Sequence, residues 1–341
     1  MRLTSGGRVR ELFLTLSLLV SVVLLVEFLL HLTDPIGVGY FKAVNDYVES
    51  LEPGGSWSYL HKPGYRARLQ GVDFVINQYG LRSPPTTIEK PRGTTRVLVL
   101  GDSVVLGWGV AQDSIFPARL DRALDAPDAP VEVIAAGVVS WNTRTEYEWL
   151  HARGFAFDPD VVVLLIVGND VEPKGAGRTD VPMLTLVAPD RAASNLAQRT
   201  WRVAYAHSYL LGWVQYLRVS ARKQRTEFAN AFPLDSPRWR DARLALDGMI
   251  DECRARGVDL VVFLYGDPGT VERSGVGRAY RDHLAARGVP TGMFPSFLFE
   301  GRRYRNSRVD AHENSPGHAI LAREIGAVVD PRLAEERSKS Q

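Results

Sequence analysis

The sequence predicts an α/β protein in which a parallel sheet is covered by helices on both faces, preceded by one membrane-spanning helix. From residue 96 onward, short β-branched runs alternate with longer helical patterns, which is the order expected for such a sheet. Ahead of this region, an apolar stretch at the amino end has the length that crosses a bilayer as a helix. The 341 residues suffice for one large domain or two small ones.

The membrane anchor is predicted at residues 12–32, which follow a cytoplasmic amino terminus at residues 1–11. Arginines precede the segment and mainly acidic residues follow it, so the positive-inside rule places the rest of the chain on the periplasmic or extracellular side of the cell (inner) membrane. A cleaved signal peptide and a buried core helix are the alternatives. The length of the segment and the lack of a small-residue cleavage site favour an uncleaved anchor. Glu27 lies near its outer end.

Residues 33–92 are predicted to form a linker and a strand-rich lead-in, with a strand near residues 72–76. The α/β domain is expected at residues 93–335, with an insertion at about residues 171–236 that is too long for a plain connection. The insertion contains an aromatic, amphipathic stretch at residues 201–218. It is interpreted either as a helical lid or substrate wall, or as an extra packing helix.

The sheet and its helices are predicted from the alternation of patterns. Strands are expected at residues 97–100, 131–135, 161–167 and 260–264. Helices are expected at residues 115–124, 143–153, 237–256, 277–287 and 316–329.

Charge and cysteine content exclude several classes of protein. The formal net charge is +2 with the charges interspersed, so no nucleic-acid-binding surface is indicated. Cys253 is the only cysteine, which excludes an internal disulfide and a cysteine-based metal cluster. Because it lies in a helical pattern without a neighbouring histidine, Cys253 is interpreted as a buried apolar residue rather than a reactive thiol.

Ser103 is the candidate nucleophile. It follows the predicted strand at residues 97–100 in the turn Gly101-Asp102-Ser103. A serine at the carboxyl end of a parallel strand faces the crevice in which open α/β sheets bind ligands. Because the tripeptide also occurs in ordinary turns, it does not identify a catalytic serine by itself.

Asp310-Ala311-His312 supplies the base that a serine nucleophile needs. In an extended segment, residues two apart point to the same side, so the Asp310 carboxylate can hold one nitrogen of His312 while the other nitrogen faces Ser103. His318 follows Pro316 in the first turn of the last predicted helix and is interpreted as a packing residue.

Donors for an oxyanion are expected on two loops that end predicted strands. Asn169, in Gly168-Asn169-Asp170, is placed at the same sheet edge as Ser103 and can donate from its side-chain amide. The loop of residues 136–142, which contains Ser140, can present a backbone N–H.

These four segments resemble, in order and spacing, the four motifs of the SGNH, or GDSL-type, hydrolase superfamily, over residues 96–329. The resemblance implies a flavodoxin-like three-layer α/β/α sandwich. It also implies Ser103 as nucleophile, His312 as base with Asp310 as its partner, and an oxyanion hole from the Ser103 N–H, a backbone N–H of the second motif and Asn169. Residues 75–82, ahead of the first strand, are similar to the lead-in of membrane-anchored bacterial members.

Two positions depart from the pattern of the superfamily. The second glycine of the second motif falls on Ser140, which brings a side chain into the expected oxyanion hole. The last motif is Asp-x-His instead of the commoner Asp-x-x-His, which places Asp310 one residue nearer to His312 than the pattern has it.

Together these features predict an extracytoplasmic serine esterase that removes O-acyl groups, such as acetyl groups, from a carbohydrate, a lipid or another small-molecule ester, without a cofactor. The alternatives are an O-acyltransferase for cell-surface polysaccharide and a catalytically weak, membrane-tethered binding or assembly protein. Metal-dependent hydrolysis is a weak third alternative, because His312 and His318 have no third ligand motif near them.

Overall fold

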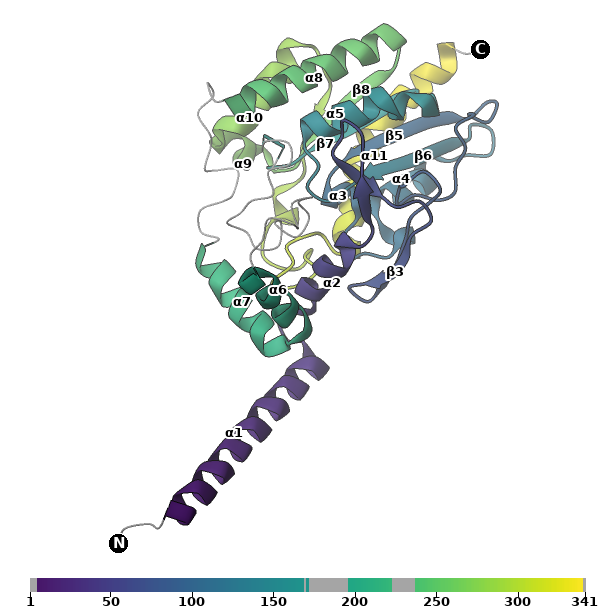
Figure 1. Ribbon diagram of the computed structural model, residues 1–341. Coiled ribbons are helices and arrows are strands. Elements are labelled where there is room, and N and C mark those ends of the chain that lie inside the picture. The colour runs from purple at the N-terminus through teal and green to yellow at the C-terminus, as the bar shows by residue number, and fades with distance from the viewer. Residues whose placement is uncertain (1–4, 169, 172–195, 223–236, 340–341) are drawn as a thin grey trace.

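A five-stranded parallel sheet forms the centre of the protein (Figure 1). The computed structural model describes residues 5–168, 170–171, 196–222 and 237–339. The sheet has the strand order β6-β5-β7-β8-β9, the order of a flavodoxin-like fold. Its strands are β5 (Thr95–Gly101), β6 (Val131–Gly137), β7 (Val161–Ile166), β8 (Asp259–Leu264) and β9 (Thr291–Gly292). The four predicted strands are confirmed, and the two-residue β9 was too short to predict.

Helices cover both faces of the sheet, which makes the predicted three-layer sandwich. Alternate residues of β5 enter two separate apolar cores, with Leu98 and Leu100 in one and Val97 and Val99 in the other. The first core contains residues of α5 (Thr143–Ala152), α8 (Pro237–Arg256) and α10 (Gly275–Ala286). The second contains residues of α4 (Phe116–Leu124) and α11 (Ser315–Lys339). All five predicted helices of this domain are therefore present.

Several short elements were not predicted, because they are too brief to show a periodic pattern. They are α3 (Ser103–Leu106), α9 (Pro268–Arg273) and the 3₁₀ turns η1 (Gln112–Ser114), η2 (Gly154–Phe157) and η6 (Ser296–Leu298). The first of them, α3, begins at Ser103, two residues after the end of β5.

The amino-terminal helix α1 (Ser5–Thr33) extends away from the rest of the protein (Figure 1). Its residues 7–33 are long and apolar enough to cross a membrane, and none of the most apolar window is buried inside the protein. An unburied apolar helix is not a core helix of the α/β domain. α1 is thus a candidate for a membrane span or a signal anchor.

The lead-in between α1 and the sheet consists of one helix and two hairpins. α2 (Gly39–Val48) lies in the stretch predicted to form a linker and strands. The hairpins pair β1 (Leu51–Pro53) with β2 (Tyr59–His61) and β3 (Arg66–Leu69) with β4 (Val72–Val75). The Tyr47 hydroxyl of α2 hydrogen-bonds His61 and accepts from the Val139 N–H, so the lead-in contacts the loop after β6.

Two helices are described within the predicted insertion. α6 (Leu196–His207) and α7 (Tyr209–Arg222) are separated by Ser208, so the predicted aromatic stretch is a helix pair and not one helix. The two helices contact each other, and both contact α2, while α7 also contacts α1. Figure 1 shows the pair beside the outer end of α1, below the sheet.

Candidate active site

Ser103 is the first residue of the short helix α3, which follows the inner strand β5. Gly101, the last residue of β5, pairs with Gly137 at the end of β6, so the loops after both strands are neighbours. The Asp102 side chain accepts the Val104 N–H at 2.9 Å and caps α3. This arrangement fixes Ser103 at the first position of the helix, where only 7% of its surface is exposed.

Ser103, His312 and Asp310 form one chain of hydrogen bonds, as the sequence pattern predicts. The Ser103 Oγ lies 2.9 Å from His312 Nε2, and His312 Nδ1 lies 2.6 Å from Asp310 Oδ1. Because a carboxylate only accepts hydrogen bonds, Nδ1 carries the proton and Nε2 is free to accept the proton of Ser103. A second acceptor, Asp102 Oδ2, lies 3.2 Å from Oγ, farther away than the imidazole.

Electrostatics favour a basic imidazole at this position. Burial lowers the pKa of His312, but the charge and hydrogen bond of Asp310, together with Asp102 and Glu313, more than offset this effect. The pKa of His312 is therefore raised above its ordinary value. The ring can take the serine proton and hold it while charge develops on the reacting ester.

Asp310 is fully buried and is held by residues that the sequence reasoning missed. Its Oδ2 accepts from Asn306 Nδ2 at 3.1 Å, and its backbone N–H donates to Ser307 Oγ at 3.0 Å. Asn306 also donates to the carbonyl of Trp108, which follows α3, at 2.8 Å. The same asparagine thus connects the carboxylate of Asp310 to the segment that carries Ser103. The sequence signal was the Asn-Ser pair shortly before Asp310, which is typical of side-chain-bonded turns.

Two oxyanion donors were expected, the side-chain amide of Asn169 and a backbone N–H of the loop that contains Ser140. Asn169 lies outside the described residues. Ser140 adopts a φ of +61°, the left-handed region that glycine favours, so this loop keeps the backbone shape of a glycine despite the substitution. Within the described parts of the chain, neither the Ser140 N–H nor the Ser103 N–H donates to an acceptor. Both remain available to an oxyanion.

Close packing of the second loop against α3 requires glycine at one position. A Cβ on Gly137 would lie 2.3 Å from the backbone nitrogen of Leu106. No side chain fits there, so Gly137 allows the loop that carries Ser140 to approach the helix that begins at Ser103.

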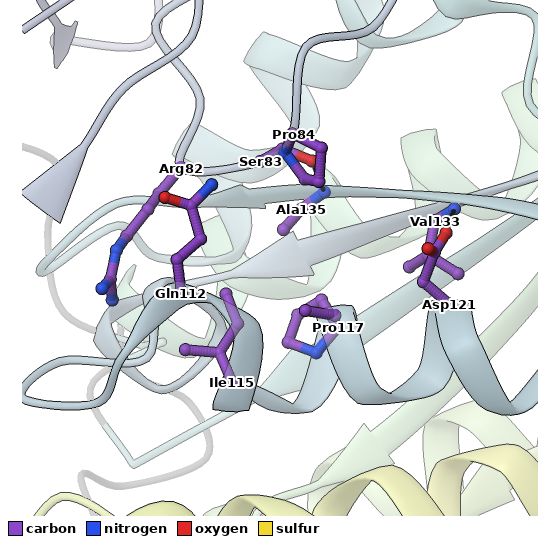
Figure 2. A pocket seen from close by; sticks show the side chains of 10 residues that line it. Arg82, Ser83, Pro84, Gln112, Ile115, Pro117, Asp121, Val133 and Ala135 are labelled. Atoms are coloured by element: carbon purple, nitrogen blue, oxygen red, sulfur yellow. Dashed lines mark hydrogen bonds between the residues drawn. The ribbon is translucent and has the colours of Figure 1, made fainter. Parts of the chain in front are cut away.

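Arg82, from the lead-in, holds the far end of α3. Its buried guanidinium donates to the carbonyls of Leu106 and Gly107 at 2.9 and 2.7 Å, and to that of Val110 at 2.7 Å. Burial lowers its pKa to about 10, so it stays charged at neutral pH. Figure 2 shows Arg82 beside Gln112 at a cavity of about 10 Å³ that it helps to line. That volume holds one water at most, and Ser103 does not line it.

Two buried carboxyl groups lie behind the site, and sequence reasoning did not single them out. Asp170 accepts from Thr143 Oγ1 at 3.1 Å and from the Val167 N–H. Glu146, on α5, is fully buried. Burial raises the pKa of both carboxyl groups well above the ordinary values, and the charge of Asp170 adds to this effect for Glu146, as the charge of Asp102 does for Asp170. Asp170 thus joins the loop that follows β7 to Thr143, the first residue of α5.

His318 and Cys253 have structural roles, as the sequence predicts. His318 is buried, stacks on Phe116 and accepts the Phe116 N–H at 3.1 Å, and burial lowers its pKa to about 3. It is a neutral packing residue, as predicted. Cys253 is buried in α8, and burial raises its thiol pKa to about 12, which agrees with an unreactive apolar role. Among the described residues, no three His, Cys, Asp or Glu side chains are grouped to hold a metal ion.

A flavodoxin-like sheet with a hydrogen-bonded serine, histidine and aspartate at its carboxyl edge defines a serine-type ester hydrolase. Residues 99–320 match the GDSL-like Lipase/Acylhydrolase family, which is more than half of the chain. The chain belongs to this family and is an ester-bond hydrolase.

Several solved structures resemble the chain at low sequence identity. A psychrotrophic esterase, EstA, from a Pseudoalteromonas species is 12% identical, with a TM-score of 0.44 over 70% of this chain and 99% of that one. TesA is 18% identical, with a TM-score of 0.42 over 70% and 99%. A lipase/acylhydrolase from Enterococcus faecalis is 15% identical, with a TM-score of 0.37 over 70% and 96%. Among the curated proteins, none matches the chain.

Proposed function

We propose that the protein is a membrane-anchored, extracytoplasmic esterase that removes O-acyl groups through an acyl-enzyme on Ser103. The observation that carries this proposal is the hydrogen-bonded chain from Ser103 Oγ through His312 to Asp310. It provides a nucleophile, a base and a group that orients the base, which together are the requirement for acyl transfer through serine.

In the first half of the reaction, Ser103 Oγ attacks the carbonyl carbon of the ester while its proton moves to His312 Nε2. The tetrahedral intermediate carries an oxyanion, for which the N–H groups of Ser103 and Ser140 and the amide of Asn169 are the proposed donors. When the intermediate collapses, the imidazolium gives its proton to the leaving alcohol. The acyl group then remains on Ser103 as an ester.

In the second half, His312 takes a proton from water, and the resulting attack on the acyl carbon releases the acid and restores the Ser103 hydroxyl. An alcohol in place of water would make the same site an acyltransferase. A carbohydrate or lipid that carries O-acyl groups is the substrate class we propose, because both occur outside the cytoplasm where the anchor would hold the site.

The test of the chemistry uses the full chain in detergent with p-nitrophenyl acetate. Ser103→Ala should lower kcat/KM by at least about 10³-fold, because the nucleophile is lost. Ser56→Ala, at an exposed serine of the lead-in, is the matched control and should keep the wild-type rate. Equal hydrolysis by wild type and Ser103→Ala would contradict the proposal.

A fluorophosphonate probe distinguishes the enzyme from the alternative of a binding protein with the same fold. Labelling that disappears in Ser103→Ala indicates an activated serine. A folded wild-type chain that takes no label would favour the binding protein.

The proposed location rests on α1 and on the arginines at positions 2, 8 and 10 that precede its apolar residues. In sealed membrane vesicles of known orientation, a Ser56→Cys variant should react with a membrane-impermeant maleimide only from the side opposite the amino terminus. Reaction only from the cytoplasmic side would contradict the proposed orientation.

A further inference from the structure

Glu27 of α1 caps the first turn of α7, and this contact fixes the helix pair α6–α7 to the proposed anchor. The Glu27 carboxylate accepts from Ser208 Oγ at 2.9 Å and from the N–H groups of Tyr209 and Leu210 at 2.6 and 2.9 Å. His31 of α1 meets the Tyr209 ring at 4.8 Å between centroids. A carboxylate at a helix amino terminus satisfies free N–H groups and the helix dipole.

The position of this contact along α1 sets the depth of α7. Glu27 lies six residues before the end of α1 at Thr33, which is about 9 Å at 1.5 Å per residue. If α1 crosses the bilayer, the beginning of α7 lies at the boundary between acyl chains and headgroups and not above the membrane. Figure 1 shows α7 beside the carboxyl-terminal end of α1, and the two helices are in contact.

α7 carries apolar side chains on two faces. Tyr209, Trp213 and Tyr216 pack on the small core formed by Ile36, Val38, Phe41 and Val309. A second stripe, Leu210, Val214 and Leu217, has the same helical spacing but belongs to none of the described cores. Leu217 is 59% exposed. Leu210 and Val214 are half-buried outside those cores, so the second stripe is only partly covered by the described part of the protein.

The charge of the pair is suited to an anionic surface. Residues 196–222 contain four arginines and no aspartate or glutamate. Helices that combine arginines with tryptophan, tyrosine and leucine lie in the interface of bilayers, and anionic lipids strengthen the binding. A water-soluble partner with an apolar groove would not require the depth that Glu27 gives to α7.

We infer that α6–α7 is an interfacial membrane-binding element, seated through Leu210, Val214 and Leu217 in the headgroup layer of an anionic bilayer that α1 spans. The inference rests on the anchoring part of the proposed function. The small core on which α7 packs includes Val309, the neighbour of Asp310. The helix pair therefore holds the loop that carries Asp310 and His312 close to the bilayer surface. The active site is then directed to esters carried by membrane lipids.

Depth-dependent quenching tests the inference on the full chain in vesicles of phosphatidylcholine and phosphatidylglycerol. Cysteine is placed at Leu217, at Leu244 on α8 and at Leu19 in the middle of α1, which are 59%, 57% and 58% exposed. Each variant is labelled with an environment-sensitive fluorophore. Cys253 can stay, because it is buried and its thiol pKa is raised to about 12.

Shallow doxyl lipids should quench the probe in Leu217→Cys and leave the probe in Leu244→Cys unchanged, while deep doxyl lipids should quench the probe in Leu19→Cys. If Leu19→Cys is quenched and Leu217→Cys is not, the anchor stands and the inference is overturned. If Leu19→Cys is not quenched, the anchor and the inference both fall. Protection of Leu217→Cys that depends on protein concentration in detergent would show a second copy on this face and would also overturn it.

Activity provides the second readout. Leu217→Glu should lower hydrolysis of p-nitrophenyl laurate dispersed in the same vesicles and keep the wild-type rate on soluble p-nitrophenyl acetate, whereas Leu244→Glu should keep both rates. Equal rates for Leu217→Glu and wild type on the vesicle ester would overturn the lipid-ester assignment. Failure of wild type on both esters would refute the proposed esterase and would not affect the quenching result.

Discussion

Asp310 and His312 are joined by two hydrogen bonds although only one residue separates them. Oδ1 of Asp310 accepts from His312 Nδ1 at 2.6 Å and from the His312 backbone N–H at 3.1 Å. The short Asp-x-His spacing is therefore compatible with the geometry that orients the imidazole. In a turn this tight, the carboxylate fixes the backbone and the ring together.

The acidic limb of the pH–rate profile tests this relationship. Because Asp310 outweighs burial and raises the pKa of His312, kcat/KM should rise with pH with a midpoint above the ordinary histidine value of 6.5. Asp310→Asn should move the midpoint to lower pH and lower the plateau on the order of 10²- to 10⁴-fold. Asp73→Asn, at an exposed aspartate of β4, is the control. An unchanged midpoint in Asp310→Asn would contradict the assigned partner.

Substitutions at Ser140 separate its backbone N–H from its hydroxyl. Ser140→Gly should raise the free energy of unfolding by up to about 1 kcal/mol, because glycine adopts a φ of +61° without strain. It should also keep the hydrolysis of p-nitrophenyl acetate, as should Ser140→Ala, if the backbone N–H is the donor. Urea denaturation and steady-state kinetics measure the two effects. A large loss of kcat in both variants would identify the hydroxyl as the donor instead.

Replacing Arg82 tests whether the lead-in supports the nucleophile. Arg82→Met should destabilise the protein by about 2–4 kcal/mol, because the carbonyls of Leu106, Gly107 and Val110 lose their buried donor. Activity should fall as well, since two of these carbonyls are in or adjoin α3. Chemical denaturation followed by circular dichroism gives the stability. Arg66→Met, at an exposed arginine of β3, should change it little, and an equal effect of both variants would argue against this role.

The sheet could be predicted from the sequence because its apolar, β-branched strands are local signals. The hydrogen-bonded set of Ser103, His312 and Asp310 could be predicted because Ser103 directly follows a strand of the sheet and a serine base with its orienting carboxylate has a short sequence pattern, Asp-x-His. The supporting residues could not be predicted in the same way. Asn306 bonds the carbonyl of Trp108, 198 residues away, and Arg82 bonds Val110 across 28 residues. Such contacts depend on tertiary packing and leave no periodic pattern, and the same is true of the contact between Glu27 and Ser208.

The pair of Glu146 and Asp170 makes stability depend on pH. Burial raises the pKa of Glu146 above the ordinary value of 4.5, so the folded protein holds a proton that the unfolded chain releases. Its contribution to stability is thus present below that value and is lost as the pH rises toward the higher folded pKa.

Glu146→Gln removes this ionisable group while it keeps the size of the side chain. The variant should therefore become more stable relative to wild type as the pH is raised from about 4.5 toward 8, because wild type loses the contribution of Glu146 there and the variant does not. Denaturation curves at several pH values measure the difference. Glu89→Gln, at an exposed glutamate, should follow the wild-type pH dependence. Parallel curves for Glu146→Gln and wild type would show that Glu146 does not hold a proton in the folded protein.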